Sequence, residues 1–425
     1  MTASGRQPAI AIGIDVGTSG ARVAAIADDG SLIASFAARY DEAADRASPD
    51  VWWNAVASCL DQLAAAISLA SVKALAVDGT SGTMLGLDAG GNPAARPLMY
   101  DQPCPDTAII AAVDAAAPAD SPARGANSAL ARAIHLSRQP GVAGVVHQAD
   151  WIAAQITGKP PVSDANNALK TGYDPIAETW PGWIEAAGMG IAKLPRVVLP
   201  GHPIGELGKA AADRFGLPAN TLITGGTTDG CASFLATGAG KPGDAVTALG
   251  STLVLKLLCD RPVNAPQYGI YSHRLGDMWL AGGASNTGGA VLAAHFSAER
   301  LAALTPDLDP ETPTGLDYYP LTKPGERFPI NDPALQPRIT PRPENEVRFL
   351  QGLLEGITSV EALGYRRLAE IGAPALASVR TVGGGANNPA FTAIRQRALG
   401  VPFLSALSTE AAVGTARLAL GATQR

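Results

Sequence analysis

Charged side chains are scarce in this sequence. Asp, Glu, Lys and Arg together make up 16% of the 425 residues, the formal net charge is −6, and no basic block occurs. Proteins whose main partner is nucleic acid or an anionic membrane usually carry clustered Lys and Arg. We therefore expect neither nucleic acid nor a membrane to be a partner of this chain.

Cysteine is also rare, and its four positions, 59, 104, 231 and 259, show neither CxxC pairs nor disulfide-like spacing. They are expected to be reduced core residues. No histidine is spaced from a cysteine or carboxylate as in a metal site, so we expect no tightly held transition metal. The stretch 1–8 has no signal-peptide core, and no stretch is apolar enough to span a membrane. We expect a soluble, cytoplasmic protein.

Apolar residues, by contrast, make up 47% of the chain, and 425 residues exceed an ordinary single domain. The chain can therefore bury large cores and is expected to form two domains. The Gly- and Pro-rich stretch 237–243 marks the boundary. We expect a first domain over 1–236, completed by a closing helix over 408–425, and a second domain over 237–407. Residues 106–160 are expected to be helical.

The chain is organised around residues 10–28, which predict two apolar strands joined by a tight turn. Small residues at a hairpin tip leave backbone N–H groups exposed and let a phosphate chain approach closely. In this hairpin they are Gly17, Thr18 and Ser19. Asp15, at the end of the first strand, adds a carboxylate suited to Mg²⁺. An ordinary surface hairpin, with Asp15 only capping the turn, stays open as the alternative.

The same pattern returns later in the chain. Between two apolar runs over 244–258 lie three small residues, Gly250, Ser251 and Thr252. Such a duplication implies two similar halves, each offering one small-residue hairpin that can grip a polyphosphate. A third turn, over 382–389, is rich in Gly, follows a strand and opens a helix. Asn388 is a good N-cap for that helix, and Pro389 is a good first helical residue.

In this order, and over nearly the whole length, the segments resemble the FGGY family of carbohydrate kinases. Residues 15–19 resemble the first phosphate motif of the family, and residues 249–252 resemble the second. Residues 225–230 resemble the segment with the catalytic Asp, and residues 383–387 resemble the adenosine motif. The resemblance implies an α/β, two-domain, actin/hexokinase-like (ribonuclease H-like) ATPase fold with the active site in the interdomain cleft.

The resemblance also implies roles for single residues, with ATP and Mg²⁺ as cofactors. Asp229 is the expected catalytic base and a sugar contact, and Asp15 is expected to face the substrate and position Mg²⁺. ATP is expected to contact Gly17, Thr18, Ser19, Arg22, Gly250, Ser251 and Thr252 through its phosphates, and Gly384, Gly385 and Asn388 through adenosine. Asp229 lies at the start of a helix, where exposed N–H groups favour an ionised carboxylate. Two alternatives stay open: Asp229 as an ordinary N-cap, and Arg22 as a surface residue of a strand.

The segment 77–83 most resembles the small ribulokinase- and xylulokinase-like sugar kinases of cyanobacteria and plant plastids. It delivers Ser81 and Thr83 at the end of a buried strand, where α/β proteins bind ligands. Both hydroxyl groups are expected to bind a polyol. Asp101 lies in a segment like the Trp-Asn-Asp of the family but lacks the Arg that usually follows, so it ranks below Ser81. Arg348 also departs from the family, which usually has His, Asn or an acid there.

The implied reaction is transfer of the γ-phosphoryl group of ATP to a primary hydroxyl group of a ketopentose, with D-ribulose ahead of D-xylulose. Other polyols, such as erythritol or glycerol, are the alternative within the same family. From other classes, an actin- or chaperone-like ATPase and an inactive sugar sensor stay open. The sequence leaves the stereochemistry of the sugar and the oligomeric state open, a homodimer included.

Overall fold

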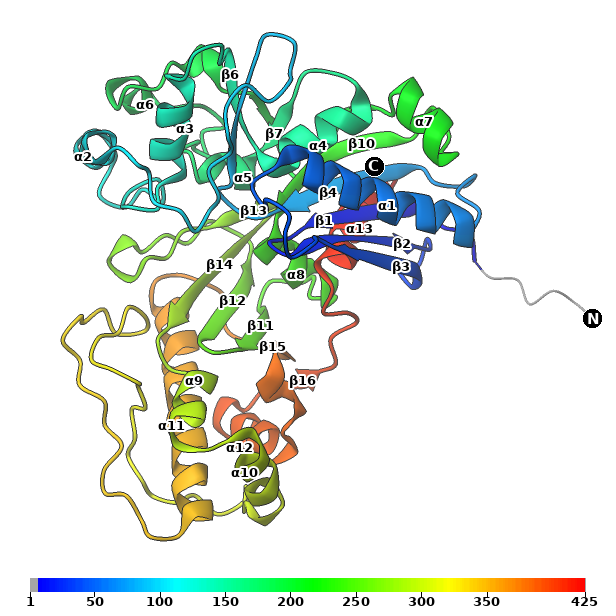
Figure 1. Cartoon of the computed structure of the whole chain (residues 1–425). Coiled ribbons are helices and arrows are strands. Elements are labelled where there is room, and N and C mark those ends of the chain that lie inside the picture. The colour runs from blue at the N-terminus through cyan, green and yellow to red at the C-terminus, as the bar shows by residue number, and fades with distance from the viewer. Residues whose placement is uncertain (1–6, 425) are drawn as a thin grey trace, which may run out of the picture. The chain divides into compact units, whose positions relative to one another are not determined.

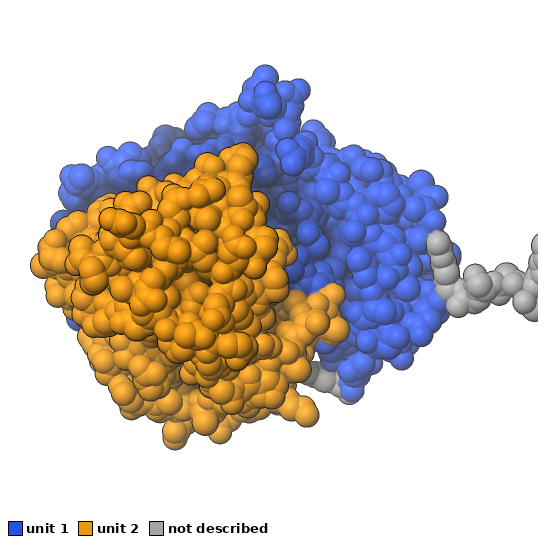
Figure 2. Space-filling view, turned by 90° about the horizontal axis from the view of Figure 1, so that it is seen from below, with its two compact units in different colours: residues 1–236, 273–276, 408–425 blue, residues 237–272, 277–407 orange. Residues whose placement is uncertain are grey.

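The computed structural model describes residues 7–424, and the chain divides into two compact units (Figure 2). Unit 1 consists of Met1–Ala236, His273–Gly276 and Ser408–Arg425, and unit 2 consists of Thr237–Ser272 and Asp277–Leu407. Residues 1–6 and 425 lie outside the described part, and with them most of the stretch expected to lack a signal-peptide core. Within residues 7–424, no helix has both the length and the apolar content needed to cross a membrane.

The central sheet of unit 1 has the strand order β3-β2-β1-β4-β10-β9 (Figure 1). Its strands are β1 (Ala11–Val16), β2 (Gly20–Ile26), β3 (Leu32–Arg39), β4 (Ala74–Gly79), β9 (Pro203–Glu206) and β10 (Leu222–Thr228). β1 and β2 form the predicted antiparallel hairpin, whereas β1, β4 and β10 run parallel to one another. The carboxyl ends of these three strands therefore meet at one edge of the sheet.

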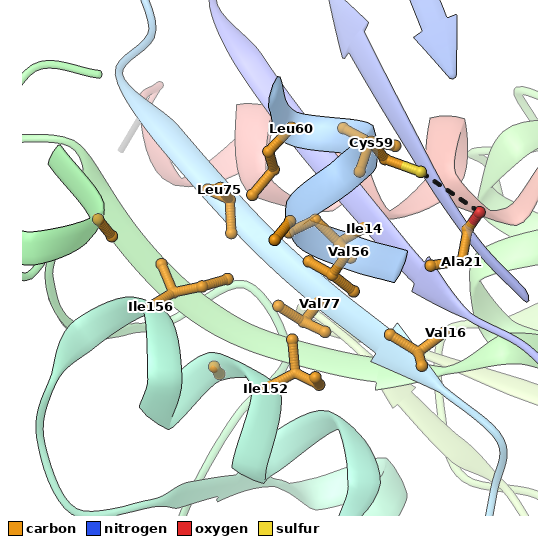
Figure 3. Packing of buried hydrophobic residues seen from close by; sticks show 14 of the residues in the cluster. Ile14, Val16, Ala21, Val56, Cys59, Leu60, Leu75, Val77, Ile152 and Ile156 are labelled. Carbon is orange, nitrogen blue, oxygen red and sulfur yellow. Dashed lines mark hydrogen bonds between the residues drawn. The ribbon is translucent and has the colours of Figure 1, made fainter. Parts of the chain in front are cut away.

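Helices cover both faces of this sheet. On one face, α1 (Pro49–Ala66) and α4 (Gln148–Thr157) pack apolar side chains such as Val56 and Ile152 against the strands (Figure 3). On the other face lie α8 (Asp229–Ala236) and α13 (Ala411–Ala422). α13 lies so close that a Cβ on Gly13 would be 2.0 Å from the carbonyl oxygen of Ala412. β1 is thus buried on both faces, which explains its nearly continuous apolar sequence.

A second, smaller core of unit 1 follows β4. It contains β5 (Met84–Leu87), α2 (Thr107–Ala116), α3 (Ala129–Ser137) and β6 (Gly144–His147). The expectation of helix throughout 106–160 is wrong at β6, which pairs with β5 in an antiparallel ladder. So short an apolar run does not distinguish a strand from a helix, and pairing with β5 decides the outcome. The remaining elements are β7 (Val162–Asp164), α5 (Ala165–Leu169), α6 (Trp183–Ala186), β8 (Arg196–Val198) and α7 (Lys209–Phe215).

Unit 2 repeats the plan of unit 1. Its strands, in spatial order, are β14 (Met278–Ser285), β12 (Leu253–Cys259), β11 (Asp244–Leu249), β15 (Ser378–Val382) and β16 (Phe403–Leu404). β11 forms an antiparallel hairpin with β12 and runs parallel to β15, just as β1 does with β2 and β4. The predicted internal duplication is therefore confirmed at the level of topology.

Four helices complete unit 2: α9 (Gly289–His295), α10 (Ala298–Leu304), α11 (Glu346–Glu370) and α12 (Pro389–Leu399). The long helix α11 buries one apolar side against the sheet, and Asn345 caps it by accepting a hydrogen bond from the Arg348 N–H at 2.9 Å. The Arg348 side chain donates to the carbonyl oxygen of Thr314 at 2.6 Å. This residue, which departs from the family pattern, therefore ties the irregular segment 308–345 to α11.

Candidate active site

Two aspartates lie side by side at the carboxyl edge of the unit 1 sheet. Asp15 on β1 and Asp78 on β4 are partners in the parallel register, and Thr227 of β10 is the partner of Asp78 on the other side. Asp229 follows β10 directly as the first residue of α8. The ends of three neighbouring parallel strands thus deliver three carboxylates.

Burial dominates the electrostatics of this group. It raises the pKa of the fully buried Asp78 well above its ordinary value, and the charge of Asp15 adds to that shift. The Thr415 hydroxyl opposes the shift, because it donates to Oδ2 of Asp78. Burial also raises the pKa of Asp15, against the charge of Arg22 and with a smaller contribution from Asp229. Asp78 Oδ1 has no hydrogen-bond donor within the described chain, so Asp78 is the more favourable place for a proton.

Arg22 faces Asp15 across the β1–β2 hairpin. Its Nη1 lies 3.3 Å from Asp15 Oδ2, and its Nε lies 3.4 Å from Glu410 Oε2. The side chain is half exposed, so its remaining N–H groups are open to a ligand. A guanidinium oriented by two carboxylates is suited to recognising phosphate oxygens.

The carboxylate of Asp15 is the part of this group that fits Mg²⁺. Carboxylate oxygens are hard ligands of the kind that Mg²⁺ prefers, and Mg²⁺ in kinases usually keeps several waters and binds substrate phosphates. Within residues 7–424, no group of three or more His, Cys, Asp or Glu side chains forms a metal cage. The residues present therefore fit an ion that arrives with a nucleotide rather than one held by protein ligands alone.

The tip of the β1–β2 hairpin is compact and accessible. Gly17 N donates to the carbonyl oxygen of Gly20 at 2.9 Å, which closes the turn, and Tyr40 OH donates to the Gly17 carbonyl at 3.1 Å. Thr18 is half-buried and Ser19 is exposed. The tip thus has the small, exposed residues that a phosphate site requires.

Asp229 lies at the first position of α8 rather than before it. Its Oδ1 accepts a hydrogen bond from the neighbouring Gly230 N–H at 2.7 Å. The first turn of a helix favours negative charge, so this position suits a carboxylate that acts as a base.

Buried polar side chains hold the loop after β4, residues 80–83. Gln148 Oε1 accepts from the N–H and the hydroxyl of Thr80 at 3.2 and 2.8 Å, and Thr80 Oγ1 lies 2.7 Å from Thr83 Oγ1. Thr83 also accepts from the Tyr100 N–H at 3.2 Å and is fully buried. The Thr83 hydroxyl is therefore engaged within the protein, which suits shaping the loop better than touching a sugar.

Ser81 differs from Thr83, because its Oγ has no hydrogen-bond partner within the described residues. Arg132 of α3 steadies the neighbouring Gly82, donating Nε and Nη2 to its carbonyl oxygen at 3.2 and 2.8 Å. Asp101 is paired with Arg46 at 2.9 Å, near the surface. The loop thus offers the Ser81 hydroxyl, while Asp101 has a partner of its own.

Among the contributors to this part of unit 1 that were not predicted site residues, four stand out, one on β4 and three on helices. Asp78 could have been found, because it ends a buried strand and opens the Gly-Thr-Ser segment. The other three lie on helices and carry no local signal: Arg132, Gln148 and Thr415. Thr415 is 337 residues away from Asp78 in the sequence, so only the fold brings the two together.

In unit 2, the loop between β11 and β12 rests on the start of α9. Gly289 N donates to the carbonyl oxygen of Gly250 at 2.8 Å, and Ala290 N donates to that of Ser251 at 3.0 Å. Gly250 and Ser251 are exposed, and Thr252 is half-buried. The loop is thus fixed from behind while its small residues stay accessible.

The Gly-rich loop after β15 packs against the end of β11. Gly383 has a φ of +88°, and a Cβ there would lie 2.6 Å from the carbonyl oxygen of Leu249, so a residue with a side chain would be strained. Gly384 is exposed and Gly385 is half-buried. Asn388 caps α12 as predicted, with Oδ1 accepting from the Phe391 N–H at 2.9 Å. The exposed glycines provide a surface without side chains next to the loop between β11 and β12.

Residues 246–423 match the C-terminal domain of the FGGY family of carbohydrate kinases. The fold resembles that of a xyloylose kinase from Brucella ovis, with 22% sequence identity and a TM-score of 0.84 over 98% of this chain and 91% of that chain. A xylulose kinase from Rhodospirillum rubrum is 21% identical, with a TM-score of 0.81 over 96% and 88% of the two chains. A glycerol kinase from Plasmodium falciparum with ADP is 15% identical, with a TM-score of 0.80 over 99% and 91%.

These likenesses extend over nearly the whole chain and confirm the predicted α/β, two-domain, actin/hexokinase-like fold. The family match covers β11, β12, the Gly-rich loop after β15 and the closing helix α13. Residues 246–423 therefore match the C-terminal domain of the FGGY family, and nearly the whole chain has the fold of the sugar kinases named above. Together these findings support a phosphotransferase that acts on sugars.

Proposed function

We propose that this kinase transfers the γ-phosphoryl group of ATP to a primary hydroxyl group of a ketopentose, with D-ribulose preferred over D-xylulose. The observation that carries the proposal is the placement of Asp15 and Asp229 at one sheet edge, with the Ser81 loop following the strand between them. Phosphoryl transfer to a polyol requires a base, a carboxylate that positions the metal, and a hydroxyl group that can bind the acceptor.

In the proposed mechanism, Asp229 orients the attacking hydroxyl group and takes its proton. Ser81 binds another hydroxyl of the sugar, and Thr83 keeps the loop in place. Asp15 would hold Mg²⁺ directly or through water, and a bound ion would supply positive charge opposite the ATP phosphates. The transition state of such a transfer is loose, so most of the catalysis comes from positioning and charge neutralisation.

The remaining predicted residues are assigned to ATP. In unit 1, phosphate oxygens are contacted by Arg22 and by the three residues of the hairpin tip, Gly17, Thr18 and Ser19. In unit 2, the exposed loop after β11 contacts phosphates through Gly250, Ser251 and Thr252. Gly384 and Gly385 lie against adenosine, where the missing Cβ atoms make room. Asn388 acts through its cap on α12, which fixes the end of that loop.

The choice of sugar rests on the 77–83 segment, which resembles ribulokinase-like enzymes. Structures of similar fold are a xylulose kinase and a glycerol kinase, so D-xylulose and glycerol are the alternative acceptors. We also propose a cytoplasmic location, supported by four buried cysteines that form no disulfide among the described residues: Cys59, Cys104, Cys231 and Cys259. Sedimentation is the measurement that tests whether the protein forms a homodimer.

The test is a coupled ADP-release screen over ketopentoses, pentitols, gluconate and glycerol. The expected result is the highest kcat/KM with D-ribulose, followed by D-xylulose. Turnover of glycerol or a hexose derivative with both ketopentoses inert would overturn the choice of sugar. ATP hydrolysis that no sugar stimulates, together with nucleotide-dependent sedimentation, would instead favour an actin-like ATPase.

A further inference from the structure

A fully buried ion pair joins two helices of unit 2. Arg395 of α12 donates Nε to Glu361 Oε2 at 2.6 Å and Nη2 to Glu361 Oε1 at 2.7 Å, and both side chains are completely buried. Removing both charges from water is costly, so such a pair is weak support for stability and is often replaceable by apolar residues. A specific role therefore has to come from the other groups that the pair contacts.

The most important of these other groups lie on two neighbouring strands of the sheet, β11 and β15. The Thr247 hydroxyl on β11 donates to Glu361 Oε1 at 2.6 Å and lies 2.7 Å from Tyr365 OH. Arg395 Nη1 donates to the Thr381 hydroxyl on β15 at 2.8 Å. Thr247 and Thr381 are partners in the parallel β11–β15 register. The ion pair is thus hydrogen-bonded to both β11 and β15 at the same position of their register.

Both strands lead directly into the loops assigned to ATP. Thr247 is followed three residues later by Gly250, and Thr381 is followed two residues later by Gly383. The loops touch one another, because Gly383 and Gly385 leave no room for a Cβ beside Leu249. A shift of one strand against the other would therefore change the spacing of the phosphate loop and the adenosine loop.

The ion pair also reaches the helix that starts at the adenosine loop. The Arg395 guanidinium lies 4.9 Å from the ring centre of Phe403 and 5.8 Å from that of Phe391. Phe391 is in the first turn of α12, and its N–H is capped by Asn388. The same guanidinium is thus in contact with β15, β16 and the beginning of α12, all of which surround the adenosine loop.

We propose that Glu361 and Arg395 are positioning residues for the nucleotide. Through Thr247 and Thr381 they set the spacing between the loop after β11 and the loop after β15, and thereby the affinity for ATP. The pair acts on nucleotide binding and leaves the sugar and the chemical step to unit 1. This inference rests on the proposed binding of ATP at these two loops.

The decisive variants separate loop positioning from stability. Glu361→Gln and Arg395→Lys keep the size of the side chains but break the bidentate pair, and Thr381→Val removes only the link to β15. The double variant Glu361→Leu/Arg395→Met replaces the pair with apolar side chains and is expected to recover the melting temperature. The exposed pair Arg300–Glu346 in the same unit supplies the control, Arg300→Met.

The measurements are KM for ATP, KM for sugar, kcat at saturating ATP, and the Kd of a non-hydrolysable ATP analogue by calorimetry. We expect KM and Kd for the nucleotide to rise ~10- to 100-fold in the single variants and in the folded double variant. The KM for sugar is expected to stay unchanged, and Arg300→Met is expected to behave as the wild type. Recovery of both melting temperature and nucleotide affinity in the double variant would overturn the proposal.

Results that disprove the proposed function can be distinguished from results that disprove this positioning role. A wild-type protein that binds the analogue but phosphorylates no sugar would overturn the acceptor alone, because the Kd values still report positioning. A wild-type protein that binds no adenine nucleotide would overturn the assignment of the loops and this inference with it. A normal nucleotide Kd in Thr381→Val, with only the melting temperature changed, would show that the link to β15 does not position the loop.

Discussion

Asp15 and Asp78 are register partners on neighbouring parallel strands, and both are buried at the edge of the sheet where Asp229 follows. Two carboxyl groups in such a position do not both ionise readily, and burial raises the pKa of each. Asp78 is the more deeply buried and receives the Thr415 hydroxyl, while Asp15 faces Arg22. Asp15 is thus the more favourable place for a negative charge, and Asp78 the more favourable place for a proton.

Asp78→Asn is expected to raise stability at neutral and alkaline pH. The raised pKa means that the folded state binds more protons than the unfolded state above pH ~3.8, so the stability of the wild type falls as the pH rises towards the folded pKa. Asparagine can still accept from Thr415 and can donate to Asp15 without titrating. The gain in melting temperature over wild type should therefore grow from pH 4.5 to pH 8. A variant that is less stable at every pH would contradict this account, and Asp317→Asn at the surface is the control.

Asp229→Asn separates binding from chemistry. If Asp229 is the base, kcat should fall by ~10²–10⁴-fold, and the lower end is expected because a loose transition state needs little early deprotonation. ATP affinity and melting temperature should hardly change, since Asn keeps the shape and caps helices about as well as Asp. Measurement of kcat, ATP Kd and melting temperature for this variant decides between base and cap. Near-wild-type turnover in a folded protein would remove the catalytic assignment.

The variant Asp15→Ala tests whether the Asp15 carboxylate positions Mg²⁺. Losing a hydrogen-bonding partner of a metal ligand typically costs ~10–100-fold in affinity or activity, and losing the positioning carboxylate itself should cost at least as much at low Mg²⁺. Additional Mg²⁺ should recover part of the activity by mass action. The measurement is kcat over a Mg²⁺ titration, with Arg22→Met as a comparison that keeps the Asp15 carboxylate but removes its ion pair and the proposed phosphate contact of Arg22. An unchanged kcat at low Mg²⁺ would exclude Asp15 from the mechanism.

His147 should make the protein sensitive to acid. Burial lowers the pKa of this fully enclosed imidazole to about 3, and the charges of Arg132 and Lys170 add to the effect. The unfolded chain, with an ordinary His pKa near ~6.5, binds the proton more readily, so stability is lost as the pH falls below that value. The loss approaches ~1.4 kcal/mol for each pH unit. In His147→Gln, the slope of unfolding free energy between pH 6.5 and 4.5 should become shallower, whereas His202→Gln should leave it unchanged.

Gly414 lets α13 lie directly on α8. A Cβ at Gly414 would be 1.8 Å from the carbonyl oxygen of Ala232, so Gly414→Ala must push the two helices apart. We expect a loss of ~1–3 kcal/mol or more in unfolding free energy, and a lower kcat, because α8 begins with Asp229. Gly421, near the end of the same helix, has open space around it. Gly421→Ala is the matched control and should gain up to ~1 kcal/mol from helix propensity. Equal stability of the two variants would contradict the packing argument.

Local sequence was enough to predict the hairpins and the resemblance to sugar kinases that the fold also shows. The β1–β2 and β11–β12 hairpins, the cap at Asn388 and the position of Asp229 next to a helix start all depend on residues close together in the chain. At 144–147 the same reasoning predicted a helix, because a short apolar run fits either state and pairing with β5 decided it. Thr83 was expected to face the sugar, but Thr80 and Tyr100 engage its hydroxyl.

The order of the motifs could thus be read from the amino-acid sequence: two small-residue hairpins, the Asp229 segment and the Gly-rich turn, each encoded within a few residues. Contacts across long stretches of chain emerge only from the folded molecule. Thr415 reaches Asp78 over 337 residues, and Arg395 reaches Thr381 and Glu361 from another helix. The physical reason is that a buried polar group is tolerated only with a partner, and which partner it finds depends on how distant elements pack.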